Sequence, residues 1–497
     1  MNQHVINFTR YTLLLLIISL VGCSNHEEQN LSEANGYKKE EMMKDKIELA
    51  IFPEKIHQTI ESFGASGAWW SQDVGGWTEN ETEELTKREY IAELLFDKNK
   101  GIGLTSYRYN LGAGSTAENS SKITDPWRRA ESFELAPGEY DWSRDKKAQW
   151  MLNTAVEYGV EDIYLFVNSP PTRLTKNGSA YGTMVDGVSS NLDPENYEAF
   201  AKYIYDVSEY FVREGVPITH ISPINEPQWE WIEGQEGNHY EPDEMVELLK
   251  VFVEEKENRS LLSDVSLSMP ELGEWGNSSY DYYDAIISDE LMMNYFDTWE
   301  IHSYWTSQFA KEDFSLWYEQ NNLDVELKMT EWTEMVNGRD YTMDSALNLA
   351  NQIYEDMTIL DVSVWQYWIA VSTYDYRDGL IYVELDTQEI TIPKRLWVMG
   401  NFSKFVRPGY RRIESHTDDN EINTLSYVGI NEEGKEEIIT ILINNSNEEK
   451  QLKMDIENST ILTAYVTDEE NDLSKYEYAA DNILVPSRSI VTLVYAD

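Results

Sequence analysis

Apolar runs of strand length alternate with longer stretches of helical periodicity over most of the chain. Eight runs rich in β-branched and aromatic residues predict strands at residues 60–66, 105–112, 163–170, 219–227, 265–272, 298–305, 325–332 and 362–370. Apolar residues at helical spacing predict helices between several of them, among others at residues 195–214, 241–257 and 345–357. Because strand and helix alternate eight times, we expect an α/β fold, a closed parallel (β/α)8 TIM barrel over residues 60–403. An open doubly wound sheet is the alternative, although no glycine-rich nucleotide loop follows an early strand.

The pattern changes after residue 403. Short segments that alternate apolar with polar residues, separated by Asn, Asp and Gly, predict strands at residues 421–429, 436–444, 460–467 and 489–495. We therefore expect an appended antiparallel β-sandwich over residues 404–497. The β-like run at residues 47–59, before the barrel, is expected to add a strand to this sandwich.

The first 46 residues carry the pattern of an exported, anchored protein. Arg10 precedes an apolar run at residues 11–21, which is too short for an ordinary membrane-spanning helix and ends in Leu20-Val21-Gly22-Cys23. Residues 1–23 thus resemble a bacterial lipoprotein signal, with lipidation on Cys23, the only cysteine of the chain. The polar residues 24–46 predict a flexible spacer. We expect a protein tethered by lipid to the extracellular face of a bacterial cell envelope.

Charge and aromatic content narrow the range of partners. The chain has 90 acidic and 39 basic residues, a formal net charge of −51, and such a surface repels nucleic acid and anionic lipid head groups. It also has 16 Trp and 32 Tyr, whose rings either fill the core or stack on the C–H faces of sugars. We expect a saccharide partner, no nucleic acid, membrane contact through the lipid anchor alone, and a monomer.

The first candidate catalytic residue is Glu226, in Ser222-Pro223-Ile224-Asn225-Glu226-Pro227 at the end of the fourth predicted strand. Barrel enzymes place their chemistry at the carboxyl ends of strands, so this side chain is expected to point into the active-site cleft. Cleavage of a glycosidic bond needs a carboxyl group that protonates the leaving oxygen, and Glu226 lies where that acid belongs. Asn225 can donate an amide hydrogen bond to a sugar 2-hydroxyl. Taken alone, the motif is also compatible with a structural Asn-Glu-Pro turn.

A second glutamate, Glu331, closes the seventh predicted strand in Lys328-Met329-Thr330-Glu331-Trp332. Strands four and seven of such a barrel face each other across its mouth. If the two carboxyls stand roughly 5–5.5 Å apart, Glu331 can attack the anomeric carbon and Glu226 can then activate water. Carboxyls this close keep Glu226 protonated while Glu331 is charged. Glu334 lies past the strand end, and we interpret it as a solvated loop charge.

Supporting side chains lie at other strand ends. Arg108, on the second strand, can hold Glu331 ionised by a charge-assisted bond, and Tyr304, on the sixth, can hydrogen-bond the same carboxylate. His302 is the one histidine whose position suggests function, as a substrate contact or as a structural hydrogen-bonding residue. The tryptophans that we expect to stack on sugar rings are Trp368, as the floor of the cleavage subsite, and Trp70, Trp229 and Trp305.

These residues resemble glycoside hydrolase family 30, in the clan whose acid/base and nucleophile glutamates lie on strands four and seven. The resemblance begins at Phe63-Gly64-Ala65-Ser66-Gly67-Ala68-Trp69-Trp70 and ends at Gly400-Asn401-Phe402-Ser403-Lys404-Phe405-Val406-Arg407-Pro408-Gly409. It implies a barrel with a side β-sandwich to which both ends of the chain contribute. It also implies Glu226 as acid/base, Glu331 as nucleophile, Arg108 and Tyr304 as the groups that hold the nucleophile, and catalysis without a metal or an organic cofactor.

Two loops look most like the endo-β-1,6-galactanase branch of that family. They are Asn168-Ser169-Pro170-Pro171-Thr172-Arg173-Leu174-Thr175-Lys176-Asn177-Gly178 after strand three, and Gln228-Trp229-Glu230-Trp231 with Gln235-Glu236-Gly237 after strand four. Asn168 thereby joins the substrate-binding candidates. We expect a retaining hydrolase of β-1,6-galactan, such as the side chains of arabinogalactan.

Other functions remain open. Within the same family the chain could be a xylanase, a β-1,6-glucanase or an exo-acting β-galactosidase or β-fucosidase, and the sequence does not separate endo from exo action. A more distant alternative is a non-catalytic sugar-binding lipoprotein, which the anchor and the aromatic residues would suit. The paired strand-end glutamates argue against it, because a binding protein has no need of two carboxyls in attack geometry.

Overall fold

The computed structural model describes residues 46–182, 189–454 and 460–496. The predicted signal, the lipidation site Cys23 and nearly all of the spacer lie outside these residues. Among the described helices, none is both long and apolar enough to cross a membrane.

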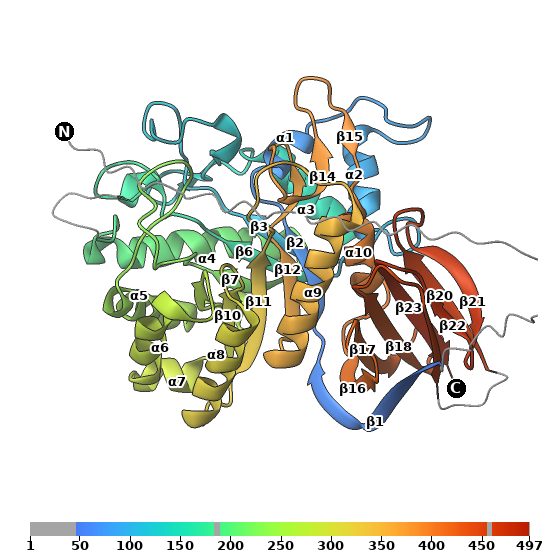
Figure 1. The fold of residues 1–497 in the computed structure, drawn as a ribbon. Helices are drawn as coiled ribbons and strands as arrows, with labels where there is room; N and C mark the ends of the chain where they lie inside the picture. The colour runs from blue at the N-terminus through green and yellow to red at the C-terminus, as the bar shows by residue number, and fades with distance from the viewer. Residues whose placement is uncertain (1–45, 183–188, 455–459, 497) are drawn as a thin grey trace, which may run out of the picture. The chain divides into compact units, whose positions relative to one another are not determined.

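A curved parallel sheet forms the centre of an α/β domain (Figure 1). Its nine strands follow the hydrogen-bonded order β8–β7–β6–β3–β2–β12–β11–β10–β9. The bounds are β2 (Ser62–Ser66), β3 (Ser106–Asn110), β6 (Asp162–Phe166), β7 (Ile218–Ser222), β8 (Ser266–Leu267), β9 (Pro270–Leu272), β10 (Thr298–His302), β11 (Glu326–Trp332) and β12 (Val364–Tyr367). The two edge strands are consecutive: only Ser268 and Met269 separate β8 from β9. The sheet therefore curls until both of its edges meet in one short segment, as in a TIM-like fold.

The predicted strands correspond to this sheet one by one, with two differences. The fifth, at residues 265–272, is divided into β8 and β9, because β8 pairs with β7 while β9 pairs with β10. The eighth, at residues 362–370, ends as β12 at Tyr367, and β13 (Ile369–Ser372) belongs to a separate small sheet with β14 (Gly379–Val383) and β15 (Ile390–Thr391). The loop between β13 and β14 becomes part of the functional site. A two-stranded hairpin, β4 (Glu134–Ala136) and β5 (Glu139–Tyr140), completes the strands of this domain.

Helices follow most strands of the curved sheet. They are α1 (Ser71–Val74), α2 (Lys87–Phe96), α3 (Lys146–Glu157), α4 (Tyr197–Arg213), α5 (Pro242–Lys256), α6 (Tyr280–Ile287), α7 (Glu290–Tyr295), α8 (Gln308–Gln320), α9 (Met343–Ile359) and α10 (Lys394–Ser403). In α4 the buried residues Phe200, Ile204, Val207 and Phe211 recur at helical spacing and form one apolar face. The predicted helices at 195–214, 241–257 and 345–357 match α4, α5 and α9 to within two residues at each end.

A second, β-rich domain follows the α/β domain and also takes up the first described strand. Its nine-stranded sheet has the order β21–β20–β23–β18–β17–β16–β1–β19–β22. The bounds are β1 (Ile47–Thr59), β16 (Arg411–Thr417), β17 (Ile422–Ile430), β18 (Glu436–Asn444), β19 (Lys450–Met454), β20 (Ile461–Thr467), β21 (Ser474–Ala479), β22 (Ile483–Val485) and β23 (Ser489–Ala496). Leu49, Leu452, Leu462, Val485 and Leu493, from strands distributed across the sheet, meet in one apolar cluster.

The β-rich character of this domain and the inclusion of β1 match the sequence prediction. The detail differs, because the strands form one continuous hydrogen-bonded sheet and not two, and because β1 pairs antiparallel with β16 but parallel with β19. Helix α10 connects the two domains: Asn401 Nδ2 donates to Thr492 Oγ1 of β23 at 3.0 Å, and the rings of Phe405 and Tyr465 lie 4.4 Å apart. The β-rich domain thus supports the α/β domain from one side.

Candidate active site

A cavity of about 840 Å³ opens at the carboxyl ends of the parallel strands. Its lining is strongly aromatic and carries several carboxylates: Trp69, Arg128, Asn225, Glu226, Trp229, Trp231, Gln235, Tyr304, Trp305, Glu331, Thr333, Met335, Asn337, Trp368, Tyr374, Asp375, Tyr376 and Asp378. Large concave sites with an apolar lining and a few converging polar groups bind small molecules or polymer segments. In a fold of this type, the carboxyl end of the sheet is also where catalytic groups gather.

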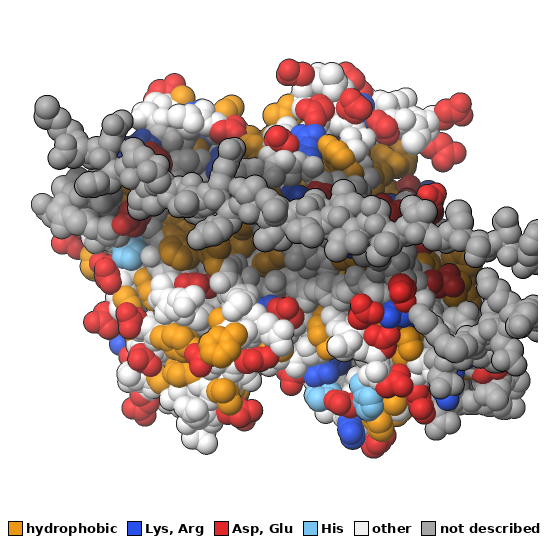
Figure 2. Space-filling model, viewed as in Figure 1, with side chains coloured by type: hydrophobic (Ala, Val, Ile, Leu, Met, Phe, Trp, Pro, Cys, Tyr) orange, Lys and Arg blue, Asp and Glu red, His pale blue; other side chains and the backbone are white. Residues whose placement is uncertain are grey.

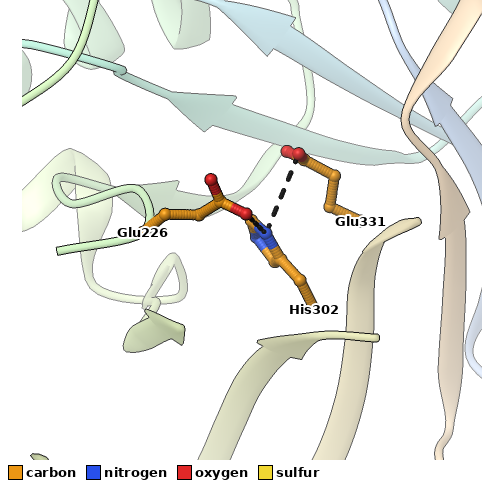
Figure 3. Close-up of side chains that lie close together, drawn as sticks. All are labelled: Glu226, His302 and Glu331. Carbon is orange, nitrogen blue, oxygen red and sulfur yellow. Dashed lines mark hydrogen bonds and ion pairs between the residues drawn. The ribbon is translucent and has the colours of Figure 1, made fainter. Parts of the chain in front are cut away.

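Glu226 and Glu331 turn their carboxyl groups toward each other in this cavity, with His302 beside both (Figure 3). Glu226 follows β7 and has a left-handed backbone, with φ at 46°, whereas Glu331 lies within β11. One carboxylate oxygen of each glutamate and one ring nitrogen of His302 all lie within 4.8 Å of one another. Carboxyl pairs at about 5 Å accompany double displacement, while pairs at about 6.5–9.5 Å leave room for a water between them. The geometry therefore suits direct attack by one carboxylate and protonation by the other.

Two side chains, Arg108 and Tyr304, hold Glu331 by hydrogen bonds. Arg108, fully buried on β3, donates from Nη1 to Glu331 Oε2, and Tyr304 OH donates to Glu331 Oε1 at 3.1 Å. Arg108 also donates from Nη2 to Asn225 Oδ1 at 3.0 Å, and its guanidinium packs 3.8 Å from the Phe166 ring centroid. These bonds hold the carboxyl group of Glu331 in a fixed orientation. Arg108 and Tyr304 thus both contact Glu331 directly.

His302 connects Glu226 to a buried carboxyl behind the cavity. Its Nδ1 lies 3.0 Å from Glu226 Oε1 and 3.8 Å from Glu331 Oε1, and its Nε2 lies 2.9 Å from Glu271 Oε2. The sequence left open whether His302 contacts substrate or is a structural hydrogen-bonding residue. Because the ring is fully buried, its position favours the hydrogen-bonding role. The neighbours Glu331, Glu226 and Glu271 outweigh the effect of burial and raise the pKa of His302 to about 9.

Burial raises the pKa of Glu226 above its ordinary value. The hydrogen bond and charge of His302 oppose this shift, and the charge of Glu331 adds to it. A raised pKa keeps a proton on a carboxyl that has to donate one near neutral pH.

The same cluster, Glu226 with His302 and Glu331, has the spacing of a metal site among the described residues. Because the cation Arg108 bonds one of these carboxylates and His302 hydrogen-bonds the other, the hydrogen-bond network alone explains the spacing.

Aromatic side chains form two groups within the cavity. Trp368 lies after β12, and its ring meets that of Trp69 edge-on at 5.1 Å. Arg128 packs over Trp69 at 4.5 Å and donates from Nε to Tyr374 OH at 3.0 Å. On the side of Glu226, the rings of Trp229 and Trp305 meet edge-on at 5.4 Å, and Trp305 is 59% exposed.

Three sequence expectations do not fit these positions. Trp70 is completely buried and donates from Nε1 to Ser66 O, so it does not line the cavity, whereas its neighbour Trp69 does. Asn168 is buried beside the site, with Nδ2 donating to Asn110 Oδ1 at 3.2 Å, and it is also outside the cavity lining. Glu334 is not a solvated loop charge: it is buried, forms an ion pair with Arg377 at 2.9 Å and accepts a hydrogen bond from Ser345.

The sequence analysis overlooked two parts of the site. Glu271 follows Pro270 on β9, and its position near the end of the fifth predicted strand was a usable signal. The cavity wall at Tyr374, Asp375, Tyr376 and Asp378 comes from the loop between β13 and β14. Such a loop has no periodicity from which its direction could be read.

Comparison with known proteins identifies a family that the sequence matches. The sequence matches the family described as O-glycosyl hydrolase family 30 over residues 46–298 and 316–382. Glucuronoxylanase XynC of Bacillus subtilis strain 168 is 25% identical over 289 residues, a match that spans 56% of this chain and 59% of that protein. An exo-beta-1,6-galactobiohydrolase of Bifidobacterium longum subsp. longum is 23% identical over 221 residues, which are 34% of this chain and 14% of that protein. A conserved exported protein from Bacteroides fragilis has a solved structure with a TM-score of 0.79 and 25% identity, covering 90% of this chain and 100% of the other.

Proposed function

The chain belongs to O-glycosyl hydrolase family 30, and from this premise we propose that it hydrolyses β-1,6-linked galactan with retention of configuration. Glu331 acts as the nucleophile and Glu226 as the acid/base. The observation that carries this proposal is the convergence of the two carboxyls, whose nearer oxygens lie within 4.8 Å of each other in one cavity.

The proposed reaction has two steps on opposite faces of one sugar ring. Glu331, oriented by Arg108 and Tyr304, attacks the anomeric carbon while Glu226 gives its proton to the leaving oxygen. In the second step water attacks the anomeric carbon of the glycosyl-enzyme and its bond to Glu331 breaks, while Glu226, now ionised, takes the proton of that water. Oε1 of Glu226 faces His302, which leaves Oε2 for the leaving oxygen and later for the water.

Cavity charge supports a neutral substrate. Four carboxyl residues line the described cavity: Glu226, Glu331, Asp375 and Asp378. Arg128 is the one cationic residue among the described lining residues, and its guanidinium already packs on Trp69 and bonds Tyr374. A uronic acid would meet repulsion here without a free cation to pair with, so the charges favour galactan over glucuronate-bearing xylan.

Two further features support galactan and internal cleavage. The loops after strands three and four resemble the galactanase branch, and one relative is named as an exo-beta-1,6-galactobiohydrolase, which supports the linkage but not internal cleavage. The exposed Trp305 with Trp229 extends the aromatic lining beyond Glu226, where it can stack on the leaving part of a longer chain. This extension favours an endo-acting enzyme.

Xylan hydrolysis is the second candidate, since the name of XynC from Bacillus subtilis is that of a glucuronoxylanase. The test is digestion of β-1,6-galactan, glucuronoxylan and β-1,6-glucan, with sizing of the products and NMR of the anomer first released. We expect short galacto-oligomers with retained β-configuration. Xylo-oligomers without galactan cleavage would refute the substrate, and inverted products would refute the mechanism.

We also propose that Cys23 carries a lipid that holds the enzyme on the extracellular face of a bacterial envelope. The support is the apolar run at residues 11–21 followed by Leu20-Val21-Gly22-Cys23. Labelling of the expressed protein with a radioactive fatty acid should give a labelled band that is lost in C23A. Equal labelling of both proteins would contradict the anchor.

A further inference from the structure

Glu271 is a completely buried carboxylate directly behind the two proposed catalytic glutamates. Its Oε2 accepts a hydrogen bond from Thr330 Oγ1 at 2.6 Å and lies 2.9 Å from His302 Nε2 and 3.4 Å from Arg108 Nη2. Glu271 is outside the cavity lining, so it does not touch a bound sugar. Its neighbours nevertheless connect it to both proposed catalytic residues: His302 bonds Glu226, and Arg108 bonds Glu331.

The surroundings of Glu271 keep it ionised. Burial acts to raise its pKa, but the positive charge of Arg108, the bond to His302 and the hydroxyl of Thr330 together lower that pKa to about 2. An ionised carboxylate only accepts hydrogen bonds, so the ring nitrogen that faces it, His302 Nε2, carries a hydrogen. Glu271 therefore decides which nitrogen of His302 stays protonated.

The other ring nitrogen, Nδ1, lies 3.0 Å from Glu226 Oε1 (Figure 3). Because Nε2 donates its hydrogen to Glu271, Nδ1 can accept a hydrogen bond from protonated Glu226. When Glu226 is ionised, Nδ1 can instead donate one from an imidazolium. The same contact thus suits both charge states through which an acid/base residue passes.

We propose that Glu271 is a positioning residue: it fixes the tautomer of His302 and thereby lets one ring support Glu226 first as acid and then as base. This inference rests on the proposed role of Glu226. Besides His302, the charged groups that face Glu226 are Glu331 from β11 and Arg108 from β3. Glu271, from β9, acts through the ring.

The first test needs no substrate. With ¹⁵N-histidine, of which the chain has 7, NMR shows which nitrogen of each ring carries a proton, and the H302Q spectrum identifies the His302 signals. We expect Nε2 of His302 to stay protonated while Nδ1 titrates near the raised pKa of about 9. In E271Q we expect the titration to move down by about one pH unit or more, because the charge that favours imidazolium is gone.

A matched control is E300Q, since Glu300 is equally buried on β10, two residues before His302. Its hydrogen bonds come from Met269 N at 3.1 Å and Thr298 Oγ1 at 3.4 Å, and not from His302. E300Q should leave the His302 signals unchanged. If E271Q does not fold, E271D keeps the negative charge but withdraws it from Nε2 by one methylene, and a smaller downward shift is expected. The proposal would be overturned if His302 titrated in E271Q as it does in the unchanged protein. If E271Q does not fold, the same result in E271D would overturn it.

The second test separates Glu226 from Glu331. In E271Q, kcat/KM on a galactoside with an alcohol leaving group should fall on the order of 10- to 100-fold, as for other lost orienting bonds. A dinitrophenyl galactoside, whose leaving group departs without a proton, should lose far less. Equal losses of kcat/KM on the two substrates would show that E271Q acts on Glu331 through Arg108. That result would refute the proposed action on Glu226 through His302. Inactivity of the unchanged enzyme on all galactosides would refute the proposed substrate while leaving the NMR result in force.

Discussion

Several residues in and behind the cavity have a strained, left-handed backbone. Trp69, Glu226, Trp231 and Trp305 line the cavity with φ values of 68°, 46°, 44° and 49°, and Glu271 behind them has a φ of 50°. The left-handed region costs a non-glycine residue about 1–2 kcal/mol, so such residues persist only where the surroundings enforce them. The first four point into the cavity from this backbone, while Glu271 lies behind it. Trp69 lines the cavity and Trp70 does not, a choice that the sequence pattern left undecided.

The proposed acid/base role of Glu226 makes a prediction at this scale. E226A should lower kcat/KM for alcohol leaving groups by about 10³-fold, since a positioned general acid contributes about 10²–10⁴-fold. Azide, which needs no general base, should restore turnover of a dinitrophenyl galactoside and give a β-galactosyl azide. Steady-state kinetics with chromatography of the products measures both effects. Failure of azide to act, with folding intact, would argue against this role.

Gly273, just after β9, makes room for the carboxyl of Glu226. A Cβ added there would lie 2.8 Å from Glu226 Oε1 and 2.8 Å from Trp229 Nε1, too close for either to stay in place. G273A should therefore lower kcat on the order of 10²-fold, the typical effect of a displacement of about 1 Å at a reacting group. In the control G276A, the nearest atom to the new Cβ is Ala310 Cβ at 3.7 Å, and activity should stay within about twofold of normal. Similar losses in both variants would contradict the explanation.

At the scale of elements, strands were easier to predict than their connections. The strands of the curved sheet are largely buried, and runs rich in β-branched and aromatic residues marked their positions. Glu226 and Glu331 were found from the same runs, because a strand end fixes the direction of a side chain. Glu271 was overlooked although it lies one residue before the end of its predicted strand, as Glu226 and Glu331 do in theirs. The wall from the loop between β13 and β14 depends on contacts such as Arg339 with Tyr374 O, which join residues 35 positions apart.

Asp162 on β6 gives a prediction for the stability of the curved sheet. Burial acts to raise its pKa, but His220, Ser62 and Thr219 together lower that pKa to about 2, below the ordinary value of 3.8. A lowered folded-state pKa contributes stability above about pH 4, which is lost as the pH falls toward 2. D162N should lower the free energy of unfolding at pH 7 by about 2 kcal/mol, and the difference from the unchanged protein should shrink between pH 4 and 2. Urea titrations across this range measure it, and a difference independent of pH would contradict the assignment.

At the scale of the whole molecule, the net charge of −51 dominates. Acidic side chains predominate on the face seen in Figure 2, with few basic ones between them. Self-repulsion of this size destabilises the folded state at low ionic strength, and salt screens it. The melting temperature should therefore rise when NaCl is raised from about 0.02 to about 0.5 M, where the Debye length falls below about 5 Å. A lower melting temperature at high salt would show that paired charges, and not the net excess, govern stability.

Family and fold class could be predicted from the sequence because both depend on patterns repeated along the chain. The continuous nine-stranded sheet of the second domain could not, because alternation within a strand does not reveal its neighbours. Substrate choice depends on the loops that form the cavity walls and on the charges that line the cavity. Both are known only from the folded chain. The catalytic roles of Glu226 and Glu331 remain a proposal that the geometry supports.

The most direct measurement is to trap the glycosyl-enzyme. A 2-deoxy-2-fluoro galactoside with a dinitrophenyl leaving group forms the covalent intermediate but slows its hydrolysis, so mass spectrometry can detect the added sugar. We predict one fluorogalactosyl group per chain, on the peptide that contains Glu331, and no adduct in E331Q. An adduct on a different carboxylate, or release of an α-anomer from a normal substrate without any adduct, would contradict the double displacement by Glu331 and Glu226.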